Sequence, residues 1–174
     1  MATFLVAGLT STVMAQNTVT TPSTVGAKIV TVLILTNQNG LNFGTISKPN
    51  GPARVTVTPD GNRTVDNAGA VKLMTADATV AASYYKVTGE QDYVYSITLP
   101  GQTDVSITNG TINLPVTDFT VLSKYEGTGV ANKKGMLKGA LGTDEFKVGA
   151  TLNLSNATVA GTYTGSFNVS VTYD

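Results

Sequence analysis

The clearest pattern in the chain is a strict alternation over its last residues, from 162 to 173. Side chains at the odd positions are apolar, aromatic or Gly, and those at the even positions are Thr, Ser or Asn. A period of two is typical of a strand that buries one face and exposes the other. We therefore expect a long central strand. The residues expected in its inward contact are Phe167, Val169 and Val171 on this strand, and Ile29, Leu33, Leu41 and Phe43 earlier in the chain.

Shorter stretches of the same kind predict strands along the rest of the chain. They cover residues 27–36, 41–46, 54–58, 83–88, 93–99, 104–108, 111–114, 116–122 and 145–154. The first of them is apolar on both faces, which fits a strand buried on both sides.

Turn residues separate these strands, most clearly at 37–40, 59–62 and the Asn109-Gly110 pair. Residues 76–82 are Ala-rich and fit a helical turn, whereas 126–142 predict a mobile loop or an edge hairpin. No stretch has the pattern of an amphipathic helix. The sequence therefore predicts one all-β domain, an antiparallel β-sandwich.

The composition is typical of an all-β protein and argues against a nucleic-acid partner. The 174 residues include 11 basic and 11 acidic side chains, so no net charge favours nucleic acid, and we expect no nucleic-acid partner. Charged residues make up 13% of the chain, and Thr, Asn, Ser and Gly, which suit sheets and turns, take their place. The chain has no Cys, so packing must hold the fold without a disulfide.

The beginning of the chain suggests export. An apolar stretch over residues 4–9, followed by Val13-Met14-Ala15, resembles the core and cleavage site of a secretory signal peptide, although no basic residue precedes Lys28. The alternative is an apolar strand or helix that stays in the protein. We interpret residues 1–15 as a signal-peptide remnant, 16–26 as an extended N-terminal arm, and 27–174 as the sandwich domain. The expected location is the bacterial cell surface or the extracellular space.

Four segments in a fixed order carry a family resemblance. They are Leu41-Asn-Phe-Gly-Thr-Ile46, Val55-Thr-Val-Thr-Pro-Asp-Gly61, Tyr95-Ser-Ile-Thr-Leu-Pro100, and Phe146-Lys-Val-Gly-Ala-Thr-Leu-Asn-Leu154 leading into Gly161-Thr-Tyr-Thr-Gly-Ser-Phe-Asn-Val-Ser-Val-Thr-Tyr173. Over most of residues 27–174 the chain resembles a family of small secreted bacterial domains of unknown function, and more distantly the spore-coat-U-like and fimbrial subunits. The resemblance implies an immunoglobulin-like sandwich, and the fimbrial relatives imply assembly by donor-strand exchange. The Cys pair of many fimbrial subunits is absent here.

Candidate catalytic residues are few. Without His or Cys, neither a Ser-His-Asp triad, nor a Cys-His pair, nor a common zinc site can be built. Two acid pairs could act as in glycosidases, namely Glu90 with Asp92 and Asp144 with Glu145. Both pairs lie in expected turns, where neighbouring acids are usually solvated. We therefore predict a protein that is not an enzyme, with no catalytic residue and no cofactor.

Two further patterns have a structural explanation beside a functional one. Residues 60–62 and 66–67 carry oxygen ligands of the kind that calcium prefers, yet a Pro-Asp-Gly-Asn turn accounts for the first of them without an ion. Tyr84, Tyr85, Tyr93 and Tyr95 could form a sugar-stacking platform, yet tyrosines on alternating strands usually pack in the core or at its rim. No metal site is therefore predicted.

The hypothesis favoured by these patterns is a structural subunit of a bacterial surface filament or pilus, assembled through the arm. One alternating face of the arm is small or apolar enough to enter a groove of another copy, and its residues are Val19, Thr21, Ser23, Val25 and Ala27. Expected partners are copies of the chain in a homopolymer, a periplasmic chaperone and outer-membrane assembly machinery. The arm could instead be a flexible leader or fold back on its own domain, and Pro22 favours that alternative. The alternative function is a monomeric surface module that binds glycan or protein.

Overall fold

The computed structural model describes residues 17–74, 79–129 and 133–174 of the chain. Every helix-or-strand element in these ranges is a strand, and they contain no helix that could cross a membrane. The strands are β1 (Ile34–Asn39), β2 (Ala53–Val57), β3 (Arg63–Val65), β4 (Ser83–Thr88), β5 (Val94–Thr98), β6 (Val105–Thr108), β7 (Asn113–Ser123), β8 (Gly127–Gly129), β9 (Lys133–Met136), β10 (Thr143–Leu154) and β11 (Ser170–Tyr173). The predicted signal segment, residues 1–15, lies outside the described residues.

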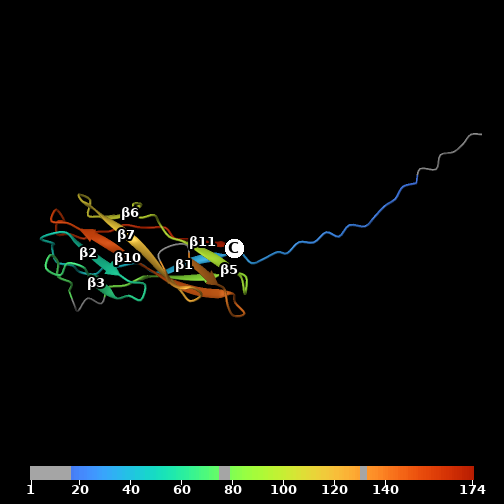
Figure 1. Ribbon diagram of the computed structural model, residues 1–174, viewed down its shortest axis with the longest axis horizontal. Coiled ribbons are helices and arrows are strands. Elements are labelled where there is room, and N and C mark those ends of the chain that lie inside the picture. Colours follow the sequence, from blue (N-terminus) through green and yellow to red (C-terminus); the bar gives the residue numbers. More distant parts are fainter. Residues whose placement is uncertain (1–16, 75–78, 130–132) are drawn as a thin grey trace, which may run out of the picture.

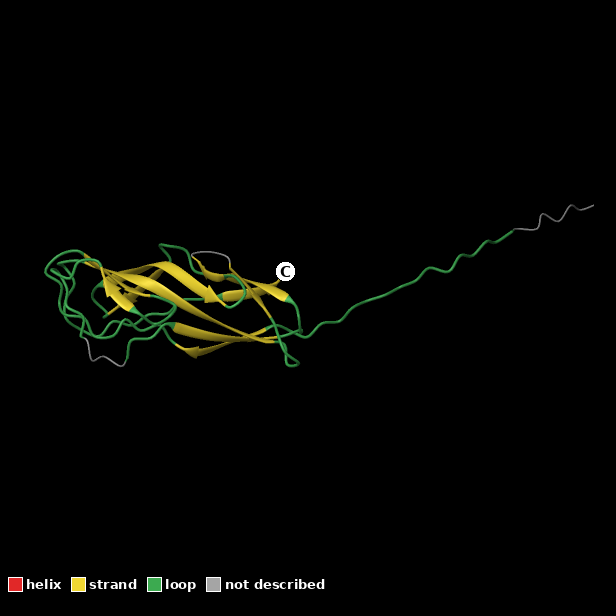
Figure 2. Ribbon diagram, turned by 60° about the horizontal axis from the view of Figure 1, so that its bottom comes forward, coloured by secondary structure: helices red, strands yellow, loops and turns green. Residues whose placement is uncertain are grey.

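These strands form two antiparallel sheets. In the larger sheet the order is β1-β4-β10-β2-β3, with β7 paired to β10 and carrying β6 and β8. The smaller sheet has the order β11-β5-β9. Together they make an elongated body with the N-terminal arm leaving at one end (Figures 1 and 2). The predicted all-β, immunoglobulin-like antiparallel sandwich is confirmed.

Strand β10 is the centre of the larger sheet. Its first half pairs with β4 and its second half with β2, while β7 pairs with it along the other edge. The change of partner occurs around Gly149, where a Cβ atom would lie 2.2 Å from the Val57 carbonyl oxygen. Only glycine allows the two backbones to approach this closely.

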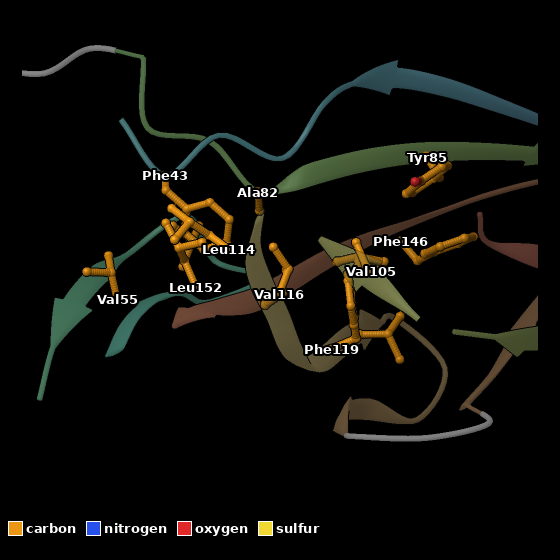
Figure 3. Close-up of a cluster of buried hydrophobic side chains, with 14 of the residues drawn as sticks. Phe43, Val55, Ala82, Tyr85, Val105, Leu114, Val116, Phe119, Phe146 and Leu152 are labelled. Carbon is orange, nitrogen blue, oxygen red and sulfur yellow. The ribbon is translucent and has the colours of Figure 1, made fainter. Parts of the chain in front are cut away.

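The core is built from strands that are far apart in sequence, and side chains of β2, β4, β6, β7 and β10 gather in it with Phe43 (Figure 3). Two pairs of aromatic rings are in contact in the core. Tyr85 of β4 stacks on Phe146 of β10 with ring centroids 5.0 Å apart. Phe119 of β7 meets Phe167 of the C-terminal segment at the same centroid distance. Apolar burial of this kind is the main force that holds a fold without disulfides.

Several predicted strands are confirmed. The prediction for 83–88 has the bounds of β4, and those for 54–58, 93–99 and 145–154 match β2, β5 and β10 to within two residues at each end. The Asn109-Gly110 hairpin also forms, because β6 and β7 pair on either side of it. In the region predicted as a loop or edge hairpin, β8 and β9 are strands; the Ala-rich prediction falls partly on 75–78, outside the described residues.

The first predicted strand is wrong in its bounds and its burial. It begins at Ile34 instead of residue 27, and it continues to Asn39 through the predicted turn. Its side chains are not buried on both sides, and Ile29, expected in the core, is 94% exposed. The physical reason is position, because β1 is the last strand of its sheet, and all of its side chains are exposed except that of the half-buried Leu35. Residues 41–46 also differ from expectation, since they make isolated bridges rather than a strand.

The strand predicted over residues 162–173 has the predicted inward face, but it does not lie at the centre of a sheet. Phe167, Val169 and Val171 turn toward the core, yet each is half-buried rather than buried. Ladder pairing is limited to one bridge at Thr164 and to β11, which is the edge of the three-stranded sheet instead of its centre. Alternation therefore identified the inward face correctly, whereas the number of partner strands was overestimated.

The ring pair Phe119 and Phe167 tests this difference in burial. Phe119 is 1% exposed, so Phe119→Ala should lower the free energy of unfolding by about 3–5 kcal/mol. Phe167→Ala should cost clearly less, because its ring is only half-buried. Urea denaturation of both variants checks the ranking. Equal losses would mean that the Phe167 side of the sandwich is as closed as the rest.

Candidate functional site

A groove of about 820 Å³ opens at the surface of the sandwich. It lies between two extended segments that come from opposite ends of the sequence, residues 40–49 and residues 158–167, which we call the first and second walls. Between the walls the described residues make no β-bridge. The groove therefore occupies a position in the sandwich where a strand could lie.

The first wall is held from one side. Asn42 exchanges main-chain hydrogen bonds with Ala81, and Ile46 is bridged to Leu73. Arg63 of β3 also binds this segment, because its guanidinium donates to the carbonyl oxygens of Phe43 at 2.7 Å and Met74 at 2.6 Å. These bonds fix the wall from outside the groove and leave it extended.

The second wall is held in the same way. Thr164 exchanges main-chain hydrogen bonds with Thr108 of β6, at 2.8 and 2.9 Å. At Gly165 a Cβ atom would lie 2.5 Å from the Ser106 carbonyl oxygen, so the glycine lets the wall approach β6. Beyond it, residues 165–169 belong to no strand before β11 begins.

The floor of the groove is apolar and continuous with the core. Phe43, Leu114 and Leu152 lie close together in this part of the cluster (Figure 3). The apolar lining consists of Leu41, Phe43, Ile46, Tyr85, Val105, Ile107, Leu114, Val116, Leu152, Leu154, Val159, Tyr163 and Phe167. Among the described residues that line it, Lys48 is the one charged side chain. The groove therefore suits an uncharged, extended occupant with small or apolar side chains.

The predicted arm is present as an extended segment. Residues 17–32 are exposed and belong to no strand, and they lead away from the body (Figure 1). The two valines predicted to enter a groove are almost free of contact, with Val19 81% and Val25 98% exposed. Within this chain the predicted interface residues therefore touch solvent and do not fill the groove.

The root of the arm is held by a cluster of hydrogen bonds, which we call the clamp: Thr31, Glu90 and Tyr173. The Thr31 amide and hydroxyl both donate to the Glu90 carboxylate, at 3.0 and 2.9 Å. The Tyr173 hydroxyl donates to the Thr31 carbonyl at 2.8 Å and accepts from the Glu90 amide at 2.7 Å. The clamp joins the arm, the β4–β5 turn and the C-terminal strand.

Packing around the clamp fixes its geometry. Tyr93 meets Tyr173 edge to face, with ring centroids 5.6 Å apart, and the Lys28 ammonium lies 4.7 Å from the centroid of the Tyr93 ring. Gly89 is required beside them, because a Cβ atom there would lie 2.2 Å from the Tyr173 hydroxyl. Sequence reasoning missed the clamp, whose members are as much as 142 positions apart.

The structure places the two candidate acid pairs differently from each other. Asp144 and Glu145 lie at the start of β10 rather than in a turn, so they point to opposite faces. The other pair does lie in a turn, but Glu90 is bound to Thr31 and Asp92 pairs with Lys138 at 3.2 Å. Asp144 and Glu145 both line a hollow of about 300 Å³, where the Asp144 carboxylate is already bound by the Tyr95 hydroxyl and the Met136 amide.

Asp144 has a structural partner instead. Its carboxylate accepts the Tyr95 hydroxyl at 2.9 Å and the Met136 amide at 3.2 Å. Burial, followed by the nearby Asp144 charge, raises the pKa of Tyr95 above its ordinary range. Gly135 lies against this ring, because a Cβ atom there would come within 2.2 Å of it. The contact links the two sheets.

The tyrosine platform and the calcium site predicted as alternatives receive no geometric support. Tyr85 and Tyr95 are buried, and Tyr93 packs on Tyr173. Asp66 accepts the Arg54 amide at 2.7 Å. No cluster of three or more His, Cys, Asp or Glu side chains suited to a metal occurs in the described part of the chain.

Comparison with known protein families confirms the predicted membership of a family of unknown function. The model of a family described as "Domain of unknown function (DUF4402)" matches residues 33–173. The chain belongs to this family. In this DUF4402 member the match begins two residues after Thr31, so the family region contains both walls of the groove but not the arm. A search among curated proteins finds no match.

The clamp should depend on pH through Glu90. The hydrogen bonds from Thr31, together with the nearby Lys28 charge, hold the pKa of the Glu90 carboxyl below its ordinary value. A lowered pKa means that the clamp is intact above the ordinary Glu pKa of about 4.3 and weakens as pH falls through the lower, folded value. The protection of the Thr31 amide from hydrogen exchange, measured by NMR relative to the intrinsic rate at each pH, should therefore decrease as the pH falls below the ordinary Glu value of about 4.3. In Glu90→Gln the acid-dependent part should vanish, and an unchanged profile would contradict the assignment.

Proposed function

We propose that this chain is a structural subunit of a bacterial surface filament, in which the arm of one copy fills the groove of the next. The observation that supports the proposal is that one molecule has two complementary surfaces, each without a partner within the same copy. One is a strand-shaped apolar groove, and the other is the extended, fully exposed arm of residues 17–26. Pairing them would add a strand between the two walls through main-chain hydrogen bonds and side-chain pockets, as in strand addition generally.

The two surfaces agree in length. The first wall of 10 residues and an arm face that spans residues 19–27 both extend about 30 Å at roughly 3.3 Å per residue. They also agree in charge, because residues 17–27 carry none and Lys48 is the one described charge lining the groove. Val19 and Val25 supply the largest apolar side chains of the arm face. Pro22 lacks an amide hydrogen and so weakens the added ladder at one position.

The geometry favours docking between copies rather than within one. The arm leaves the end of the body where β11 and the C terminus lie, whereas β10 ends toward the opposite end (Figure 1). The clamp and the Lys28–Tyr93 contact hold the root against reversal. Donor and acceptor are different patches, so the contact is head-to-tail and grows an open filament.

This arrangement also sets the direction of the docked strand. We take the incoming arm to enter the groove from the end opposite the resident clamp, because the acceptor's own arm leaves the body at the clamp end. Its N-terminal tip then points toward the acceptor's β11. The donor strand therefore runs parallel to the first wall and antiparallel to the second.

The proposal implies further partners and a location. A free subunit would expose the apolar floor of its groove, which invites uncontrolled strand pairing. A periplasmic chaperone that covers the groove, and outer-membrane machinery that exchanges it for an arm, are the partners expected for such a subunit. The filament would stand on the cell surface.

Deleting residues 17–26 tests the proposal. The shortened chain should stay a folded monomer, because these residues make no contact with the body, and it should form no polymer. Electron microscopy and size-exclusion chromatography of the intact and shortened chains give the answer. Filaments from the shortened chain would overturn the proposal. An intact chain that remains monomeric would leave the groove to the alternative function, a module that binds glycan or protein.

A matched pair of substitutions separates arm docking from loss of the arm. Val25→Asp places a charge on the face proposed to enter the groove, where an unpaired buried charge is strongly unfavourable. Thr24→Asp places the same charge on the opposite face. Polymer yield should fall severely for Val25→Asp and change little for Thr24→Asp. Equal yields from the two variants would contradict the face assignment.

A further inference from the structure

A second apolar surface follows the arm. Val30, Val32 and Ile34, which we call the shoulder, are 37%, 70% and 51% exposed. In an extended chain such alternate residues share one face. The residues between them point the other way, because Thr31 joins the clamp and Leu33 packs against the core. The shoulder is therefore the outward face of the root.

The shoulder has the features of an uncovered contact. It continues into β1, which is the last strand of its sheet, so its main chain is unpaired on one edge. The adjoining positions are polar, because Ile34 faces Thr88 across the ladder and Thr36 faces Lys86. Three apolar side chains with a polar border resemble a small interface.

The position of the shoulder indicates which surface of a neighbouring copy would contact it. If the arm fills a neighbour's groove as far as Ala27, Val30 and Val32 follow within about 10 and 17 Å of chain. A docked arm therefore holds these valines beside the end of the neighbour's groove where the arm enters. We call this end, at the start of the second wall, the groove mouth. At that mouth Val159 lines the groove and is itself 40% exposed.

We propose that the shoulder is a second contact between copies of this chain, packed against the neighbour's groove mouth around Val159. The inference rests on the proposed function and adds a surface outside the groove. Three side chains are too few for a stable dimer on their own. Once the arm is docked, however, the shoulder meets its partner at a high effective concentration, so a small area is sufficient.

The test uses filaments of the full chain. Val32→Thr keeps the shape and strand preference of the side chain but adds a hydroxyl, which weakens apolar burial. Filaments of this variant should still form, and subunits should dissociate from them in urea about five to ten times faster than from the parent. Val159→Thr should have a similar effect, and the double variant should add little, since both remove one contact.

Tyr125→Thr is the matched control, because Tyr125 is a 49% exposed apolar residue in the β7–β8 turn, outside both surfaces. Its filaments should dissociate like the parent's. Thermal unfolding of each subunit provides the second readout, and a loss of domain stability that accounts for the faster dissociation would overturn the shoulder contact.

The outcomes separate the two proposals. Filaments that assemble through the arm but dissociate at the parental rate in Val32→Thr overturn the shoulder contact and leave the proposed function intact. A parent chain that forms no filament overturns both. A monomeric parent whose binding to neutral phosphatidylcholine vesicles is lost in Val32→Thr would assign the shoulder to a membrane instead.

Discussion

One structural constraint governs this molecule: no described residue supplies a strand between the two walls of the groove. Each wall is bonded on its outer side, the first to residues 72–81 and the second to β6. Between them lies the apolar floor, continuous with the core. Buried main-chain groups and apolar surface both favour a partner. The molecule is therefore stable as a sandwich but has one site that an extended chain would complete.

The C-terminal segment connects the two functional surfaces. Near its start, Tyr163 and Phe167 line the groove, and near its end Tyr173 binds the root of the arm. One extended segment thus forms part of the proposed acceptor and part of the donor's anchor. Tension on an arm would pass through the clamp into the wall that holds the next arm. In a filament, this would carry load along the chain instead of through flexible loops.

Local sequence patterns predicted much of this fold. Alternation located β4 and β2, because each buries alternate side chains, and it located β10, whose first half alternates although its middle is buried on both faces. The same signal could not show how many neighbours a strand has, which is why residues 162–173 were expected at the centre of a sheet. Periodicity reports which face is inward, whereas pairing depends on residues that are distant in sequence.

The candidate site was predicted only in part. The arm and its alternating face could be read from composition, but the groove depends on walls that are more than 100 positions apart. The apolar run at residues 29–35 was interpreted as doubly buried, yet Leu33 and Leu35 pack inward while Val32 and Ile34 are exposed. A run apolar on both faces arises equally from burial within one domain and from a contact with another molecule, and one sequence does not distinguish them.

Disulfide cross-linking tests the central claim most directly, because the chain has no cysteine of its own. Subunits carrying Val25→Cys would be paired in turn with Ile46→Cys, Ile107→Cys or Leu152→Cys in the same chain, with Thr24→Cys as the control. The account predicts a ladder of covalent multimers for at least one Val25 pair and none for Thr24. A disulfide confined to monomers, or no disulfide in any Val25 pair, would contradict it.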